Sequence, residues 1–261
     1  MFGIWLALAA AGFCGAARGQ APAYSAAGIV NASDYSAGPF APNSVLTAFG
    51  ANFSFTTEGL TEENIVSATL PTQLGDISVY IDNTIVPLLY VSPGQINFLV
   101  PTNEIAGDVP LRVVRQGLTG PTVTITLVNA APALFASPGG YALAQDYNAQ
   151  SATVTAAAPA QPGDLIVLYA TGLGATQPLP LTGEIPEYGG SIQPSALSSF
   201  QVLLNGQALN PSTVPYAGLT PGFAGLYQVN FYLPQNCPPN PQIQLAVGTQ
   251  ISASGINLAV Q

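Results

Sequence analysis

The sequence predicts an all-β protein of two tandem β-sandwiches behind a cleaved export signal, and three observations support this. Many short segments alternate apolar and polar residues with period two, the pattern of a strand with one buried face. An ordered series of such segments occurs twice along the chain. No segment after the first twenty residues has helical periodicity, and 27 Gly and 24 Pro interrupt the chain too often for long helices.

The first element is an apolar run over residues 4–17, followed by Ala17-Arg18-Gly19. Small residues at positions −3 and −1 predict signal-peptidase cleavage between Gly19 and Gln20, although no Lys or Arg precedes the run. The run is shorter than the ~20 residues that span a bilayer. We therefore expect residues 1–19 to be a signal peptide, the mature chain to have no transmembrane segment, and the protein to be secreted or extracytoplasmic (periplasmic or cell surface).

Three strands are predicted in the first unit. Residues 77–81, 96–100 and 123–127 each place Ile, Val, Phe or Leu at alternate positions. Asp82-Asn83 follows the first of these and can form a hairpin turn, because both residue types tolerate positive φ.

The second unit repeats the first. Ser44 to Gly50 matches Ile166 to Gly172, Val79 to Asn83 matches Val202 to Gly206, and Gln95-Ile96-Asn97-Phe98 matches Gln228-Val229-Asn230-Phe231. The offsets increase from 122 to 133 residues, so the length changes fall between the matched segments. Asn205-Gly206 predicts a two-residue hairpin turn.

Short strands in units of about 100 residues indicate immunoglobulin-like β-sandwiches. We place the first at 21–129 and the second at 130–261. We expect lead-in strands at 142–145 and 151–155, and hypothesise that the lead-in segment 130–164 pairs with both units and stiffens the junction.

The amino-acid composition excludes several classes of catalytic and binding site. The chain has no His, three basic residues against 12 acidic ones, and 6% charged residues. Catalytic triads, imidazole metal sites and a basic nucleic-acid footprint are therefore not expected. We predict no catalytic, cofactor-binding or metal site, no cofactor and no nucleic-acid partner. Cys237 is the single cysteine after residue 19, and we expect an inert, partly buried thiol rather than an intermolecular bridge.

Several longer segments resemble the C-terminal domain family of secreted acidobacterial proteins, a family without established function. They are Gly28-Ile29-Val30-Asn31-Ala32, residues 42–53, residues 89–98, residues 162–174, residues 217–222 and Tyr227-Gln228-Val229-Asn230. Phe49-Gly50-Ala51-Asn52-Phe53 is also similar to the opening strand of IPT/TIG-type immunoglobulin-like domains. The resemblance implies fold and export, and it supplies no site residues.

Three sets of residues are candidates for a site. Carboxylates that could hydrolyse glycosidic bonds are Glu58, Glu62, Glu63, Glu184 and Glu187, which are read more simply as solubilising loop charges. Oxygen ligands that could hold calcium are Asp146, Tyr147, Asn148 and Asp164, which are also ordinary turn residues. Rings that could stack on sugars are Tyr80, Tyr90, Tyr188, Tyr216 and Tyr232, although strand aromatics are first of all packing residues.

These observations favour an exported, non-enzymatic binding or adhesion module, whose extracellular carbohydrate or protein ligand the sequence does not identify. The alternative is a self-assembling structural subunit of an envelope or matrix, which would pair through its sheet edges. A carboxylate-dependent glycoside hydrolase ranks third.

Overall fold

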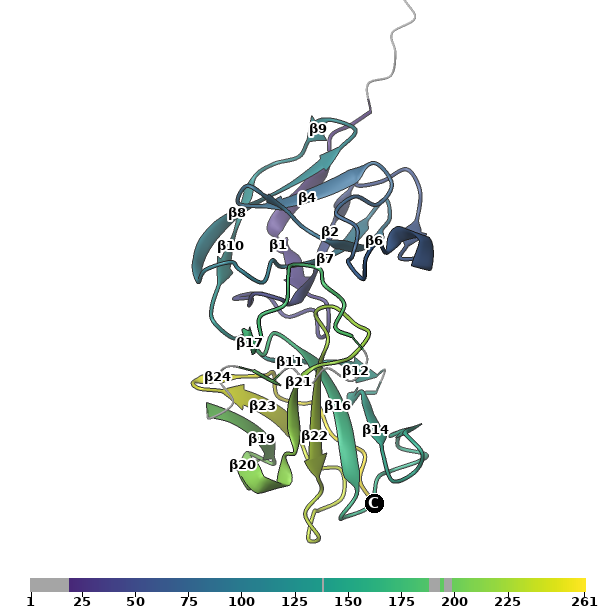
Figure 1. The fold of residues 1–261 in the computed structure, drawn as a ribbon, viewed down its shortest axis with the longest axis vertical. Coiled ribbons are helices and arrows are strands. Elements are labelled where there is room, and N and C mark those ends of the chain that lie inside the picture. The colour runs from purple at the N-terminus through teal and green to yellow at the C-terminus, as the bar shows by residue number, and fades with distance from the viewer. Residues whose placement is uncertain (1–18, 138, 188–192, 195–198) are drawn as a thin grey trace, which may run out of the picture.

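The computed structural model describes residues 19–137, 139–187, 193–194 (backbone only) and 199–261. These residues form two β lobes that meet end to end (Figure 1), with β1 to β10 in one lobe and β11 to β24 in the other. No helix in the described ranges is long and apolar enough to cross a membrane.

The first lobe contains two antiparallel sheets. One sheet has the order β1 (Ala23–Asn31), β2 (Val45–Ala51), β7 (Gln95–Leu99), β6 (Leu88–Val91) and β3 (Glu58–Gly59). The other has the order β10 (Val123–Leu127), β8 (Gly107–Arg115), β4 (Ile77–Ile81) and β5 (Thr84–Ile85), with β9 (Leu118–Thr119) beside β8.

The alternating residues of these strands explain why the two sheets pack face to face. Ile96 and Phe98 of one sheet and Val79 and Val113 of the other are fully buried in one cluster. Burial of a side chain of this size contributes about 1.5–3 kcal/mol. The period-two pattern therefore fixes which face of each strand is internal.

The second lobe is also a pair of antiparallel sheets. One has the order β15 (Ala152–Thr153), β14 (Ala144–Asp146), β16 (Leu165–Thr171), β22 (Tyr227–Tyr232) and β21 (Tyr216–Leu219), with β11 (Ala133–Leu134) also beside β16. The other has the order β20 (Gln207–Ala208), β19 (Phe200–Leu204), β23 (Ile243–Val247) and β24 (Gln250–Ile251). Small pairs are β12 (Ala136–Ser137) with β13 (Tyr141–Ala142) and β17 (Thr176–Gln177) with β18 (Gln193–Pro194).

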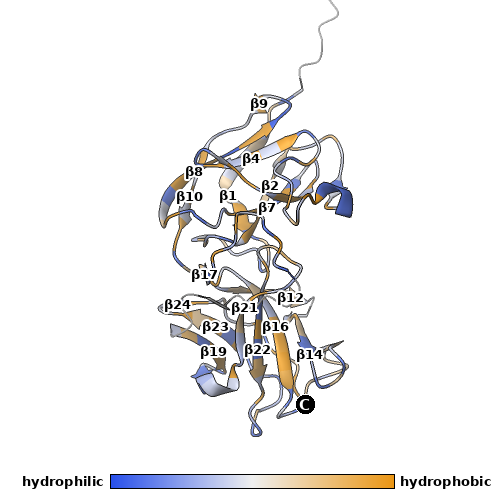
Figure 2. Ribbon diagram, viewed as in Figure 1, coloured by the Kyte–Doolittle hydropathy of each residue, from blue (hydrophilic) through white to orange (hydrophobic). Residues whose placement is uncertain are grey.

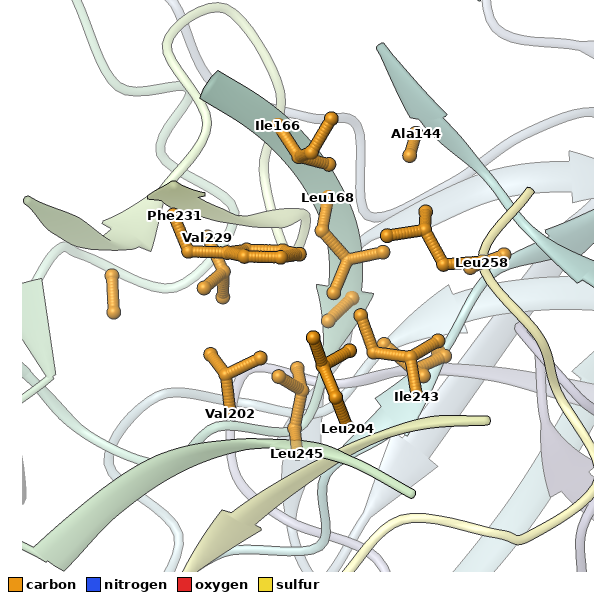
Figure 3. Close-up of a cluster of buried hydrophobic side chains, with 14 of the residues drawn as sticks. Ala144, Ile166, Leu168, Val202, Leu204, Val229, Phe231, Ile243, Leu245 and Leu258 are labelled. Carbon is orange, nitrogen blue, oxygen red and sulfur yellow. The ribbon is translucent and has the colours of Figure 1, made fainter. Parts of the chain in front are cut away.

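The second core lies between these sheets. Leu168 of β16 and Phe231 of β22 point toward Val202 of β19 and Leu245 of β23 (Figure 3). β16 is the most continuously hydrophobic strand in the view of Figure 2, because it is covered on both sides along much of its length. The hydrophilic 3-10 helix η1 (Glu62–Asn64) contrasts with it, and a second 3-10 helix, η3 (Pro211–Thr213), precedes β21.

The two lobes repeat one topology, as the sequence predicts. The central pair β2 and β7 corresponds to β16 and β22, and the opposite pair β4 and β8 corresponds to β19 and β23. Each lobe also has a parallel bridge near its end, Phe40 with Leu127 and Ala160 with Val260. The predicted all-β fold of immunoglobulin-like sandwiches is confirmed.

The predicted hairpins are present. Asn205 and Gly206 join β19 to β20 with φ of 49° and 75°, the left-handed conformations that this turn requires. Asp82 takes the same conformation, with φ of 49°, between β4 and β5. The lead-in strands are also found, as β13 to β15.

The lobes are joined by contacts that the sequence does not predict. Leu70 N–H donates to Gly183 O at 2.9 Å, and Ile185 N–H donates to Ala68 O at 2.8 Å, so two loops pair across the junction. Thr102 Oγ1 donates to Pro180 O at 3.0 Å.

A small apolar cluster fills the centre of the junction. It contains Val45, Leu70 and Leu99 of the first lobe and Ala224 of the second. In the described residues, the backbone pairs of segment 130–164 lie within the second lobe, for example Ala131 N–H with Gly172 O at 2.8 Å. Backbone pairing across the junction comes instead from loop 180–185, which bonds to Ala68 and Leu70, while Gly225 lies against Val45 of β2 and Leu99 of β7.

Candidate functional site

The clearest candidate site is a surface that occurs once in each lobe, on the outer side of the central strand. In β7 the inward Ile96 and Phe98 are buried, while Gln95 and Asn97 point outward and are half-buried. Gln95 Nε2 donates to Asn97 Oδ1 at 2.9 Å.

The second lobe has the same arrangement in β22. Gln228 and Asn230 are half-buried on the outer side, and Gln228 Nε2 donates to Asn230 Oδ1 at 2.8 Å. The two amide pairs therefore match in residue type, spacing and hydrogen bond.

A tyrosine stands opposite the asparagine in both lobes. The register places Tyr90 of β6 across from Asn97, and Tyr216 of β21 across from Asn230. Both rings are half-buried, and Tyr216 O–H donates to Leu219 O at 2.6 Å. We name Tyr90, Gln95 and Asn97 the N-terminal face, and Tyr216, Gln228 and Asn230 the C-terminal face.

Further aromatic rings border each face. Phe49 is opposite Gln95 in the β2–β7 pair, and the ring of Tyr35 lies 5.8 Å from it; the two side chains are 41% and 61% exposed. In the second lobe Tyr232 follows Asn230 by two residues on the same side of β22 and is 47% exposed. Tyr169 is opposite Gln228.

The amide groups are held in fixed orientations. Thr47 Oγ1 donates to Asn97 Oδ1 at 3.1 Å, so this oxygen accepts from two directions. Tyr169 O–H donates to Gln145 Oε1 at 2.9 Å, and burial raises the pKa of Tyr169. Both faces are built from uncharged side chains, so they present dipoles and rings rather than charge.

The structure places the candidate tyrosines in different parts of the protein. Tyr90 and Tyr216 belong to the two faces, and Tyr232 borders the C-terminal face. Tyr80 lies on the other sheet of the first lobe, where the guanidinium carbon of Arg112 is 4.5 Å from the ring centre. Tyr188 is outside the described residues.

A cleft with a volume of about 630 Å³ lies at the junction. Thr102 and Glu104 line it from the first lobe, and Leu173, Gly174 and Thr249 line it from the second. Burial raises the pKa of Glu104, and the charge of Asp82 adds to this effect. A cavity of this size could admit a small molecule, but it offers one carboxyl group and no aromatic ring among its lining residues.

The candidate carboxylates are distributed over surface loops. Glu62 and Glu63 are exposed in η1, and Glu187 is exposed. Glu58 Oε1 accepts from Thr56 Oγ1 at 2.7 Å, and Glu184 Oε2 accepts from Leu181 N–H at 2.7 Å. These bonds are local loop contacts, and they aim neither carboxylate at a partner acid.

The candidate calcium ligands are partly brought together. Asp146 and Asp164 interact, and the pKa of Asp146 is raised by burial first and by Asp164 second. Asp146 Oδ1 accepts from Asn148 N–H at 2.9 Å, as a turn residue does. Within the described ranges, no three His, Cys, Asp or Glu side chains gather as a metal site would require. Asp164 precedes β16, whose other end reaches the junction at Thr171, so the pair and the junction lie at opposite ends of this strand.

Cys237 is 8% exposed, and burial raises the pKa of its thiol. Its Sγ lies 3.6 Å from Pro238 O. A buried thiol with a raised pKa forms little thiolate, which agrees with the prediction of an inert side chain.

Comparison with known proteins adds the fold family of one lobe. Residues 30–127 match the IPT/TIG domain family. None of the curated proteins matches the chain.

Solved structures with a similar course of the chain include three from larger proteins. A surface glycan-binding protein (SGBP-B) of Bacteroides ovatus, in complex with a mixed-linkage heptasaccharide, is 9% identical with a TM-score of 0.33 over 85% of this chain and 43% of that one. A surface glycan-binding protein of Prevotella bryantii is 12% identical with a TM-score of 0.25 over 87% and 40%. The plexin A4 extracellular region is 11% identical with a TM-score of 0.30 over 95% and 19%. The chain spans less than half of each of these structures.

Proposed function

We propose that this chain is an exported, non-enzymatic binding protein whose two faces hold a neutral, hydroxyl-rich ligand such as a polysaccharide. The proposal includes a signal peptide over residues 1–19, of which residues 1–18 lie outside the described part. It also includes an extracytoplasmic location, two units that meet near residues 129 and 130, and membership of the acidobacterial family that the sequence resembles.

The observation that carries the proposal is the repetition of Tyr, Gln and Asn in the same positions of both lobes. Asn is depleted in strands, and the outer side of a strand can be filled by many other residue types. An amide pair with a tyrosine across from it is therefore not required by the sandwich fold, yet it occurs twice.

The chemistry of the faces suits a sugar. Asn and Gln amides offer both donors and acceptors, as vicinal hydroxyl groups do. Tyrosine rings offer flat apolar surfaces for the C–H faces of a pyranose. The absence of charge from the named residues of both faces favours a neutral ligand over a sulfated or uronic one.

The test measures binding of residues 20–261 to a panel of neutral and acidic polysaccharides by affinity electrophoresis and calorimetry. We expect saturable binding to a neutral member. Tyr90→Ala and Tyr216→Ala should each weaken it about tenfold, or about 1.4 kcal/mol. Tyr147→Ala is the matched control, because Tyr147 is 64% exposed and belongs to neither face.

Two results would contradict the proposal. One is the absence of binding to every polysaccharide by protein with native circular dichroism. The other is wild-type affinity in the Tyr90→Ala/Tyr216→Ala double variant. Concentration-dependent oligomers in the first case would favour the structural-subunit alternative, and hydrolysis of a polysaccharide would favour the enzymatic one.

A further inference from the structure

Three residues of the first lobe, Asn52, Phe55 and Arg115, form a small site beside Gln20, where the chain enters the lobe. We call this site the socket. The backbone carbonyl of Gln20 accepts from Arg115 Nη2, and its side-chain Oε1 accepts from Asn52 Nδ2 at 3.2 Å. Arg115 is only 2% exposed, and its Nη1 donates to Asn52 O at 2.7 Å. The guanidinium carbon lies 4.2 Å from the centre of the Phe55 ring, so the socket is a built structure.

The predicted cleavage between Gly19 and Gln20 would make this held residue the first of the mature chain. A free α-amino group has a pKa of about 7.7–8.0 and is largely protonated at neutral pH. It would then belong to the residue whose carbonyl is bonded to the buried guanidinium. Arg115 Nε has no hydrogen-bond partner among the described residues, and a free amine would place a second positive charge beside this buried guanidinium.

We propose that Gln20 is converted to pyroglutamate and that Asn52, Phe55 and Arg115 hold the resulting ring. This inference rests on the export proposed above. In its unprotonated form the α-amino nitrogen attacks Cδ of its own side chain and the new N–Cδ bond closes a five-membered lactam. The Cδ–Nε2 bond breaks, and Nε2 takes a proton from the attacking nitrogen and leaves as ammonia. No oxidant, reductant or cofactor is needed.

The product suits the socket better than the free terminus does. The lactam nitrogen is uncharged, so the repulsion with Arg115 is removed. The former Oε1 remains a carbonyl oxygen and keeps its ability to accept from Asn52.

The experiment expresses the full 261-residue chain in an export-competent bacterium and analyses the purified protein by intact mass and Edman degradation. We expect the mass of residues 20–261 less one ammonia (about 17 Da) and a blocked N-terminus. Pyroglutamate aminopeptidase should remove the ring from unfolded protein but not from folded protein, because Asn52 and Arg115 hold its two carbonyl oxygens. Gln20→Ala is the matched control: it should begin with a free Ala and show a lower thermal midpoint than the cyclised protein.

The possible failures are distinguishable. A chain that begins at Gln20 with a free amine would overturn cyclisation and leave export intact. A chain that retains residues 1–19, or begins elsewhere, would overturn the export on which the inference rests. Removal of the ring from folded protein, or an unchanged midpoint in Gln20→Ala, would overturn its seating in the socket.

Discussion

The hydroxyl group of Tyr227 joins the two lobes, and its removal tests whether the junction is as tightly built as the structure indicates. Tyr227 is fully buried, and its O–H donates to Gly174 O at 2.5 Å. The same oxygen accepts from Nδ2 of Asn43, a residue of the first lobe, at 3.3 Å. Burial raises the pKa of Tyr227 far above its usual value, so the hydroxyl group stays protonated at neutral pH.

Tyr227→Phe keeps the ring and removes only the hydroxyl group. A net hydrogen bond contributes about 1 kcal/mol, and an unsatisfied buried partner costs about 1–3 kcal/mol. Because the carbonyl of Gly174 and the amide of Asn43 both lose this partner, we expect a loss of about 2–3 kcal/mol from the free energy of unfolding.

Urea unfolding followed by circular dichroism measures this loss, since the single Trp lies in the predicted signal peptide and gives no fluorescence signal in residues 20–261. Tyr232→Phe is the matched control because Tyr232 is 47% exposed, and it should change stability by less than about 0.5 kcal/mol. A Tyr227→Phe variant as stable as this control would refute the reasoning.

Three other predictions concern positions away from the two faces. Gly225→Ala should lower the free energy of unfolding in urea by about 1–3 kcal/mol more than Gly206→Ala does. Both glycines have φ near +75°, but only at Gly225 would a Cβ meet Leu99 Cδ1 (2.4 Å) and Val45 Cγ2 (2.9 Å). Equal losses in the two variants would contradict this packing. The raised pKa of Asp146 means that the folded state binds a proton more tightly than the unfolded state, so stability falls as the pH rises from the usual Asp value of 3.8 through the raised pKa. Asp146→Asn should remove this part of the pH dependence and gain stability relative to the native protein above that window, and a pH-independent difference in unfolding free energy would argue against it. In residues 20–261, the thiol of Cys237 should react with an aromatic disulfide at pH 8 much more slowly when folded than in urea, and equal rates would show that it is accessible.

The strands and their inward faces were predictable because a half-buried strand alternates apolar and polar residues in the sequence. Ile96 and Phe98 illustrate this, as do Val229 and Phe231, and the repeat of the two segments predicted a repeated lobe. The turn at Asn205-Gly206 was predictable for a different reason, since few residue pairs tolerate two positive φ angles.

The candidate site was found only in part. Tyr90 and Tyr216 were candidates because of their residue type, but Gln95, Asn97, Gln228 and Asn230 served only as markers of the repeat. The available signal was that both copies place the same two amides on the outer side of a strand, where the fold imposes little constraint. In the first lobe, the register that sets Tyr90 opposite Asn97 depends on a bulge in β6 and could not be read from the spacing.

The junction has no sequence pattern comparable to the alternation of the strands. It is made by irregular loops whose partners are far apart in the sequence, such as Leu70 with Gly183. Loop backbones have no periodicity that would reveal such pairing, and the expectation therefore fell on the nearer segment 130–164. Arg115 gave no signal either, because one arginine in an alternating strand resembles a solvated charge until its burial against Gln20 is seen.

The paired loops and the buried Asn43–Tyr227 contact also determine how a long ligand would be held. They restrict rotation of one lobe against the other, so the separation of the two faces is set by the protein rather than by a flexible linker. A polymer already bound at one face would then meet the second face at a high effective concentration, provided that the polymer reaches it in register. If the polymer does not reach it, the second face would contribute nothing to binding. Under the proposed function, the junction therefore sets the ligand length at which both faces can bind at once. Avidity should rise sharply once an oligosaccharide is long enough to reach both faces. Weakening the junction should make this rise more gradual without changing the affinity of either face alone.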